Sequence, residues 1–468
     1  MAPVSARSAR WALASLSLST LLSSLATSIA SVGLPSLMQA FGASFQFVQW
    51  VVLAYLLAIT TLIVSAGRLA DIFGRRPLLL GGIALFTFAS VLCGLAPTLS
   101  LLIAARAAQG LGAAVMMALT LAFVADTIPR EKTGSAMGLL GAMSAIGTTL
   151  GPSLGGLLIA GFGWRAIFLV NLPLGALAFA LAYRVLPAGK ISKPDRRGFD
   201  GVGTALLALT LAAYAMAMTL GRGSFGSLNI GLLLAAGVGG LLFVIAQTRA
   251  ENPFIRPARF RDHALNASLA MSLIVATVMM ATLVVAPFYL SRALALDAAM
   301  VGLVLSTGPL VTALAALPAG RLVDRFGAHR IMVVGLLALA LGTFILSQAR
   351  TEFGIAGYVV PIIIVATGYS LFQTSNNSAV MTGVASDQRG VVSGLLNLSR
   401  NLGLITGASV MGAVFAFASA AGSEGTGLAV LAPAAAARGM QVTFQVATAL
   451  VVAALILAVI SARRGQHG

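Results

Sequence analysis

The chain alternates between long apolar runs and short segments that carry most of its charges. Apolar runs of about 20 residues, the length that crosses the hydrocarbon core of a bilayer as one helix, recur from one end of the chain to the other. The pattern predicts fourteen membrane-spanning helices, at residues 11–37, 47–66, 77–96, 100–125, 134–160, 165–186, 202–220, 228–247, 265–290, 299–319, 330–348, 356–381, 390–416 and 440–462.

Composition agrees with a membrane protein and argues against a soluble one. Hydrophobic residues make up 59% of the 468 residues and charged residues 9%, and the mean hydropathy is +0.99. The net charge of +17 would suit a nucleic-acid partner, but the basic residues cluster in short loops between apolar runs, so we expect none. Cys93 is the only cysteine, which excludes an intrachain disulfide and a thiolate metal cluster. We expect neither a cofactor nor a metal.

The distribution of basic residues predicts the orientation in the membrane. With a cytoplasmic N-terminus, 22 of the 29 lysine and arginine residues fall in the tails and the even-numbered loops. Five lie on the opposite side, and Arg106 and Arg400 fall inside spans. Basic residues accumulate on the cytoplasmic side of membrane proteins, so we expect both termini in the cytoplasm and an inner-membrane location. Arg7 and Arg10 before the first run resemble a signal peptide, but the run continues through residues 32–35 and favours a retained helix.

One short charged stretch occurs twice. Residues 67–77 read GRLADIFGRRP, and residues 320–330 read GRLVDRFGAHR. The shared positions of the first copy recur 253 residues later; they are Gly67, Arg68, Leu69, Asp71, Phe73 and Gly74, repeated as Gly320, Arg321, Leu322, Asp324, Phe326 and Gly327. Two copies at matching places in two halves indicate an internal duplication. An ordinary basic loop would explain a single copy more easily than both.

These stretches resemble a known family. The first copy is similar to the loop between helices 2 and 3 of the major facilitator superfamily, and the second to the loop between helices 8 and 9. Residues 106–114 (RAAQGLGAA), 147–156 (GTTLGPSLGG) and 164–175 (WRAIFLVNLPLG) resemble further signatures of its fourteen-helix drug:proton antiporters. The resemblance implies an all-α integral membrane protein with two six-helix bundles, at residues 1–187 and 263–468. The segment 188–262 would hold a cytoplasmic linker and a two-helix insert, for which we expect a structural or lipid-facing role.

Polar side chains inside the spans are the candidates for a substrate cavity, because such groups are costly in lipid and need a partner or water. They are Arg106, Gln109, Gln373, Asn376, Asn377, Asn397 and Arg400. For Arg106, a structural role on the carbonyls of a neighbouring helix is an equal alternative. For the amides near residue 376, hydrogen bonds between helices are favoured slightly over substrate binding.

The resemblance also assigns residues to gating and conformational change. These are Gly67, Arg68, Asp71, Gly74, Arg75, Asp126, Gly147, Gly151, Pro152, Gly320, Asp324 and Gly327. By the family pattern, Arg75 would pair with Asp126, and Asp71 would cap a helix near Gly390. Pro152 would bend its helix, while the glycines before it would allow close helix packing. Packing alone is the alternative for that motif.

The first span departs from the family. Related antiporters carry an acid and an asparagine where this chain has Ala26 and Ser31, and all twelve acidic residues fall in loops or at span ends. The expected function is export of a small amphipathic compound, linked to protons, by a monomer that is not an enzyme. Two alternatives stay open: an exporter or uniporter of an organic anion without standard proton coupling, and a transporter-like sensor without flux. Ala26 keeps both alternatives open.

Overall fold

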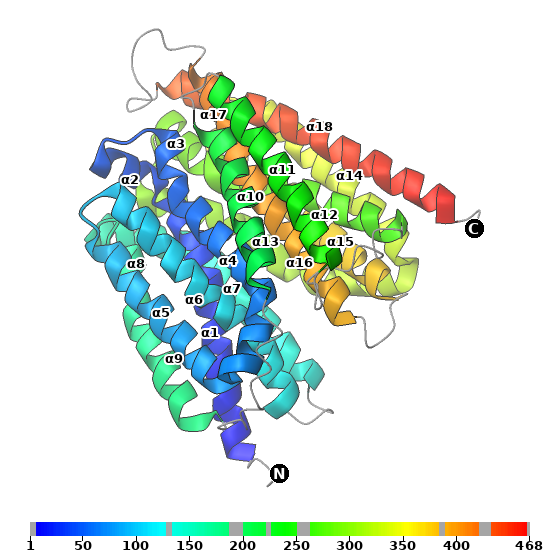
Figure 1. The fold of residues 1–468 in the computed structure, drawn as a ribbon. Coiled ribbons are helices and arrows are strands. Elements are labelled where there is room, and N and C mark those ends of the chain that lie inside the picture. Colours follow the sequence, from blue (N-terminus) through cyan, green and yellow to red (C-terminus); the bar gives the residue numbers. More distant parts are fainter. Residues whose placement is uncertain are drawn as a thin grey trace. The chain divides into compact units, whose positions relative to one another are not determined.

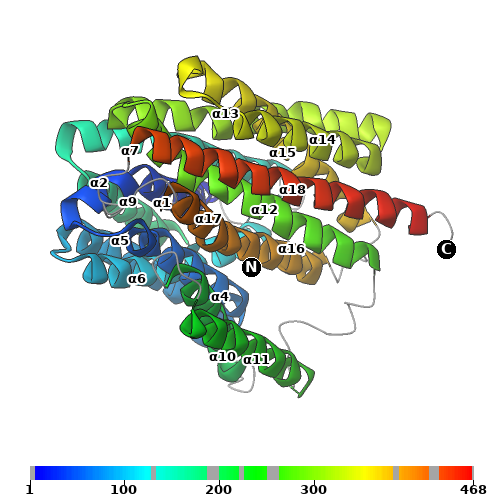
Figure 2. The same cartoon turned by 90° about the horizontal axis from the view of Figure 1, so that it is seen from above.

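The structure, a computed structural model, describes residues 6–127, 133–186, 200–220, 226–249, 263–382, 389–420 and 432–465. Several side chains within these ranges, among them those of residues 67, 68, 71 and 124–138, lie outside the description. All regular elements in the described ranges are helices (Figures 1 and 2). Fourteen of the described helical segments are long and apolar enough to cross a membrane, which confirms the predicted all-α architecture and its fourteen spans.

The helices follow the apolar runs closely. Those before the linker are α1 (Ala6–Val32), α2 (Leu34–Phe41), α3 (Phe45–Val48), α4 (Trp50–Phe73), α5 (Arg75–Leu95), α6 (Leu99–Thr127), α7 (Thr133–Phe162), α8 (Ala166–Leu169) and α9 (Asn171–Val185). The insert holds α10 (Gly201–Thr219) and α11 (Ser227–Arg249). After it come α12 (His263–Phe288), the π-helix η4 (Tyr289–Ala293), α13 (Ala298–Phe326), α14 (Ala328–Ser347), the short η5 (Thr351–Phe353), α15 (Ala356–Thr382), α16 (Arg389–Thr406), the π-helix η6 (Gly407–Met411), α17 (Gly412–Ala420) and α18 (Pro433–Gly465).

Backbone contacts divide the chain into two compact units. Unit 1 consists of Met1–Gly33, Trp50–Ala213 and Ala235–Phe254. Unit 2 consists of Leu34–Gln49, Tyr214–Leu234 and Ile255–Gly468. Unit 2 therefore includes α2 and α3 from the first half of the chain, and each unit draws on part of the insert.

Helices in unit 1 pack closely where one of them carries a glycine. In this unit α1 packs on α7 and α9, and α5 packs on α6 (Figure 1). A Cβ atom at Gly147 of α7 would lie 2.6 Å from the carbonyl oxygen of Leu21, and one at Gly112 of α6 would lie 2.6 Å from the amide nitrogen of Phe86. No larger side chain fits at these contacts unless the backbones move apart.

Unit 2 repeats this arrangement. Here α12 packs on α16, and α14 packs on α15 and α18 (Figure 2). Gly403 of α16 lies against the carbonyl of Leu273, and a Cβ atom at Gly335 of α14 would lie 2.6 Å from the amide nitrogen of Phe372. Gly403 follows Gly147 by 256 residues in the chain. The small residues that bring helices together thus recur in both units, as an internal duplication would require.

The repeated charged stretch is mostly helical, and its turn is a single glycine in each copy. Residues 67–73 and 320–326 form the ends of α4 and α13, whereas the predicted spans end at residues 66 and 319 and leave these segments between helices. Gly74 has φ 86° and ψ 140°, and Gly327 has φ 86° and ψ 145°. This backbone region is open almost only to glycine. The same residue type in the same conformation therefore connects α4 to α5 and α13 to α14.

Candidate functional site

Arg106 lies in the interior of unit 1 with none of its surface exposed. Its Nε donates to the carbonyl oxygen of Val51 on α4 at 2.8 Å, and one Nη donates to the carbonyl oxygen of Ala26 on α1 at 3.3 Å. The other Nη donates to Oε1 of Gln109, one turn further along α6, at 2.5 Å. The guanidinium thus connects three helices through its planar set of donors.

Neighbouring groups complete this buried site. Gln109, also fully buried, donates from Nε2 to the hydroxyl of Ser90 on α5 at 2.7 Å. The Arg106 guanidinium carbon lies 4.1 Å from the ring centroid of Tyr55 and 5.9 Å from that of Phe168, both within the range of cation–π attraction. The Tyr55 hydroxyl in turn donates to the carbonyl of Ser23 at 2.9 Å. In this conformation Arg106 is a structural link, and its predicted contact with a substrate stays a prediction.

Ala26, the position at which the family pattern has an acidic residue, lies beside the Arg106 guanidinium. Ala26, at which the resemblance led us to expect a carboxylate, accepts a hydrogen bond from Arg106 through its backbone carbonyl and is fully buried. The Arg106 guanidinium is therefore surrounded by carbonyl dipoles and aromatic faces, whereas a carboxylate at position 26 would lie beside it. The sequence aligned Ala26 with the family pattern but could not show that it lies next to Arg106.

The polar residues predicted on α16 lie on one face of that helix. Val392, Leu395 and Leu396 pack in a cluster with Leu265 and Leu269 of α12. Another face of α16 carries Asn397 and Arg400, three residues apart, and both are exposed. The face packed on α12 is mostly apolar, with the Ser399 hydroxyl donating to the carbonyl oxygen of Leu269 at 2.5 Å, and the exposed face carries the amide and the guanidinium. An exposed guanidinium within a spanning helix requires water or a polar partner.

The amides predicted on α15 have different environments. Asn376 is 2% exposed and donates from Nδ2 to the carbonyl oxygen of Ser268 on α12 at 3.4 Å. Gln373 is partly exposed and Asn377 is exposed. The structure therefore places Asn376 between helices, and it leaves Gln373 and Asn377 more accessible than Asn376.

Several residues predicted to control gating fall on side chains that the structure does not describe. These are Arg68, Asp71 and Asp126, so the proposed Arg75–Asp126 pair and the placement of Asp71 near Gly390 lie outside the described residues. Gly147 and Gly151 of α7 lie against α1, where a Cβ at Gly151 would overlap the hydroxyl of Ser28. Pro152 lies inside α7, which continues as an α-helix on both sides of it.

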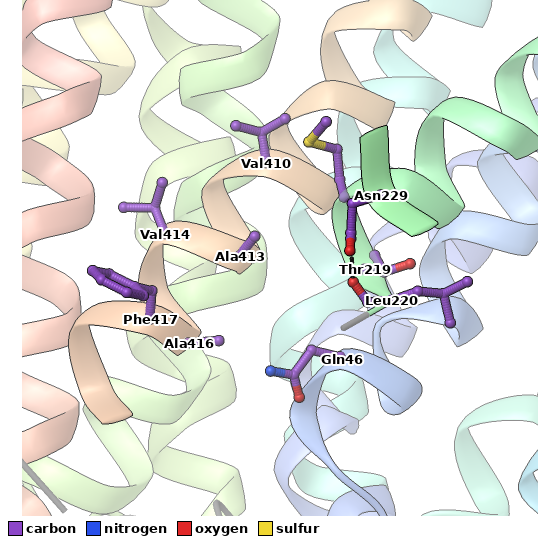
Figure 3. A pocket seen from close by; sticks show the side chains of 10 residues that line it. Gln46, Thr219, Leu220, Asn229, Val410, Ala413, Val414, Ala416 and Phe417 are labelled. Atoms are coloured by element: carbon purple, nitrogen blue, oxygen red, sulfur yellow. Dashed lines mark hydrogen bonds between the residues drawn. The ribbon is translucent and has the colours of Figure 1, made fainter. Parts of the chain in front are cut away.

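Unit 2 contains a pocket that was not predicted from the sequence. The pocket has a volume of about 380 Å³, and its lining residues come from α3, α10, α11, η6 and α17 (Figure 3). They are Gln46, Met218, Thr219, Leu220, Asn229, Val410, Ala413, Val414, Ala416 and Phe417. The only available signal was the pair Gln46 and Gln49 beside an apolar run.

Sequence comparison identifies relatives of the whole chain. The sequence profile of the Major Facilitator Superfamily matches residues 16–408 and residues 267–467. The chain is 34% identical over 393 residues to multidrug resistance protein Stp of Mycobacterium tuberculosis (strain CDC 1551 / Oshkosh), covering 83% of this chain and 72% of that protein. It is 29% identical over 395 residues to riboflavin transporter RibZ of Clostridioides difficile (strain 630), covering 84% of this chain and 86% of that protein.

Solved structures share the fold at low sequence identity. A bacterial homolog of the human lysosomal transporter Spinster, inward-facing and unoccupied, has a TM-score of 0.72 and 15% identity, with 98% of each chain covered. The nucleoside transporter NupG has a TM-score of 0.69 and 12% identity, with 96% of this chain and 99% of that chain covered. The profile match, the related sequences and the fold agree with the motifs quoted above: the chain belongs to the Major Facilitator Superfamily of membrane transporters.

Proposed function

We propose that this chain exports small amphipathic compounds across the cytoplasmic, inner membrane by alternating access, as a monomer with both termini in the cytoplasm. Relatives named for multidrug resistance and drug efflux support an export role. The glycine connections and small-residue contacts that recur in both units support an internal duplication. Transporters that work by alternating access are commonly built from such repeats.

The polar face of α16 is the observation that supports transport most directly. Arg400 follows the first residue of α16 by 11 positions, which is about 16 Å of helix. A guanidinium in contact with lipid at such depth costs about 2.5–3.5 kcal/mol or more. Arg400 is exposed rather than packed on α12, so water or a substrate would have to contact its guanidinium. Arg400, with the exposed Asn397 three residues before it, marks where we expect unit 2 to face the transported molecule.

Proton linkage is the second part of the proposal. A group that couples protons to substrate must change its protonation during the cycle, and carboxylates commonly do so in transporters. All twelve acidic residues of the chain fall between the predicted spans or at their ends. The candidate is therefore an acid at the membrane surface, and Asp126 in the last turn of α6 is the first to test.

Purified protein in liposomes would test both parts. A pH gradient of either sign would be imposed, and the flux of cationic, neutral and anionic compounds would be followed for the native chain and for Asp126→Asn. Gradient-dependent flux of cationic or neutral compounds that Asp126→Asn abolishes is the expected result. Flux that ignores the gradient would contradict proton linkage, and absence of flux for every compound would contradict a transport role.

A second candidate function is export or uniport of an organic anion. Two observations favour it: the exposed guanidinium of Arg400, and Ala26 at the place of the usual acid. A relative named as a riboflavin transporter shows that named functions among the relatives extend beyond drug efflux. In the same liposomes, Arg400→Gln should then lower anion flux by about tenfold, because one charge-assisted hydrogen bond contributes about 1.5–3 kcal/mol, and leave the flux of neutral compounds unchanged.

A further inference from the structure

The pocket in unit 2 has apolar walls and one buried polar group without a partner. Apolar side chains line most of it, among them Leu220 and Phe417 (Figure 3), and Met218 also lines it. Gln46 is 9% exposed, and its Oε1 has no hydrogen-bond partner among the described residues. A buried amide oxygen without a donor is unfavourable, since it has lost its bonds to water. This oxygen is covered, but a half-turn of the carboxamide exchanges its oxygen and nitrogen and would present Oε1 to the pocket. A molecule that enters the pocket with an N–H or O–H group would then satisfy it.

Packing on both sides holds α3 in place, so Gln46 stays at the pocket wall. The ring of Phe45 is buried and meets the ring of Phe288 edge-on at 4.7 Å between centroids, and that of Phe415 at 5.2 Å. After Gln46, the buried amide of Gln49 lies directly against Gly412, where even a Cβ atom would overlap it. The backbone that carries Gln46 is therefore anchored to α12 and α17.

The opposite wall, at the end of the inserted hairpin, is also preformed. Asn229 of α11 is 3% exposed and donates to the carbonyl oxygens of Ala217 and Leu220 at 2.7 and 2.5 Å. Its Oδ1 accepts from the amide of Gly226 at 3.1 Å, so its polar atoms are used within the hairpin. The Tyr214 hydroxyl of α10 donates to the hydroxyl of Thr406 on α16 at 3.2 Å, which ties the hairpin to the helix that leads into the third wall.

A π-helix shapes the third wall. The turn η6 (Gly407–Met411) interrupts the α-helical register between α16 and α17, and Val410 within it lines the pocket. Single π-helical turns are uncommon and often occur at functional sites, because the extra residue redirects the side chains that follow. The register change sets the direction of Ala413, Val414 and Phe417 on α17, which make up much of the apolar surface.

We propose that α3, the end of the α10–α11 hairpin and the η6–α17 segment form a binding site for a small molecule with an apolar body and one hydrogen-bond donor. The volume of about 380 Å³ lies within the range of small-molecule sites, and the donor would bind Oε1 of Gln46. The site contains none of the residues assigned to transport above, and with the proposed topology it lies at the extracytoplasmic end of the insert. The insert therefore builds a ligand site, in addition to any contact with lipid.

Binding of aminoanthracene to the full chain in lipid nanodiscs tests the proposal without any transport measurement. Anthracene serves as the matched probe, because it has the same rings and no donor. We expect saturable binding of aminoanthracene, measured by fluorescence. Gln46→Leu should weaken it roughly tenfold, as the loss of a bond to a buried group predicts, while anthracene binding is unchanged. Ala413→Trp should abolish binding of both probes by filling the pocket. Val452→Trp, at an exposed position of α18, should bind as the native chain does.

Cysteine protection gives a second measurement that does not depend on the stability of the Ala413→Trp variant. Cys93→Ser removes the only cysteine, and Met218→Cys then places a thiol at the pocket wall. Aminoanthracene should slow maleimide labelling there and leave labelling of Val452→Cys unchanged. Equal affinity of Gln46→Leu and the native chain for aminoanthracene would overturn the donor site. Probe signals that do not saturate, with no protection of the Met218→Cys thiol, would mean partition into lipid and would overturn the pocket as a ligand site.

Discussion

Arg106 shows how a single residue in a spanning helix can be accommodated without a counter-charge. Its donors meet the carbonyls of Val51 and Ala26 and the amide of Gln109, and the ring of Tyr55 faces its guanidinium. Val51, Ala26 and Tyr55 become partners through packing between helices, which the sequence does not display, whereas Gln109 lies one turn away on α6 itself. This is why the sequence left structural and substrate roles equal for Arg106, whereas the contacts favour a structural role in this conformation.

Arg106→Lys should destabilise the protein, because a lysine ammonium keeps the charge but cannot reproduce the planar set of bonds. Each polar group left unpaired in the interior costs about 1–3 kcal/mol, so the melting temperature in detergent should fall by several degrees. Arg350→Lys, at an exposed position, is the matched control and should change stability by less than about 0.5 kcal/mol. If Arg106→Lys melted like the native chain and lost only transport, the residue would belong to the substrate path instead.

At the scale of single elements, apolar runs predicted where helices lie, and they failed where packing changes the backbone. The predicted first span, 11–37, is divided at Gly33 into α1 and α2. A Cβ atom at Gly33 would lie 2.9 Å from the Ile167 side chain, which is a contact between distant parts of the chain. The π-helices η4 and η6 could not be predicted either, because an apolar run indicates where a helix lies and not the register of its backbone hydrogen bonds.

The repeated stretch predicts a contrast between two glycines of the second copy. Gly327→Ala should cost about 1–3 kcal/mol of stability, because φ 86° with ψ 145° strains any residue with a Cβ. Gly320→Ala should be neutral or stabilise by up to about 1 kcal/mol, since Gly320 is helical with open space around its Cα. Thermal unfolding in detergent compares the two. A loss of transport in Gly320→Ala at unchanged stability would show that the motif glycine acts in gating, whereas equal melting losses in both variants would contradict the conformational argument.

The glycine motif of α7 predicts a second contrast along one helix. A methyl group at Gly147 would press on the backbone of α1, at Leu21 and Leu25, so Gly147→Ala should cost about 1–3 kcal/mol as an overpacked contact. Gly161→Ala, in the same helix with nothing near its Cα, should be neutral or slightly stabilising. Melting curves of the two variants measure this difference directly. Indistinguishable curves would mean that α1 and α7 are not packed as the structure shows.

At the scale of the whole molecule, the fold followed from the sequence far better than the candidate site did. Fourteen apolar runs were enough to predict spanning helices, because a helix satisfies all backbone groups of a run of about 20 residues in lipid. The duplicated stretch and the other motifs carried the resemblance that implied a transporter. Site residues depend on which faces of those helices meet. Asn376 and Asn377 are neighbours in sequence, yet one lies buried against α12 and the other is exposed. Gln46, at the end of an apolar run, could not be connected to residues near 218 and 413 without the folded chain.

The orientation of the whole chain in the membrane can be tested at the two ends of α14. This helix has 20 residues, a length of about 30 Å that matches the hydrocarbon core. His329 is exposed at the start of this span, and Thr351 is exposed just beyond its end. The distribution of the 29 basic residues predicts that these two residues lie on opposite sides of the membrane. In a Cys93→Ser background, a membrane-impermeant maleimide added to whole cells should label Thr351→Cys and leave His329→Cys unlabelled until the cells are permeabilised. Both thiols should react in detergent, which controls for accessibility. The reverse pattern in whole cells would place the termini outside the cytoplasm, and the extracytoplasmic position proposed for the unit 2 pocket would be reversed with them.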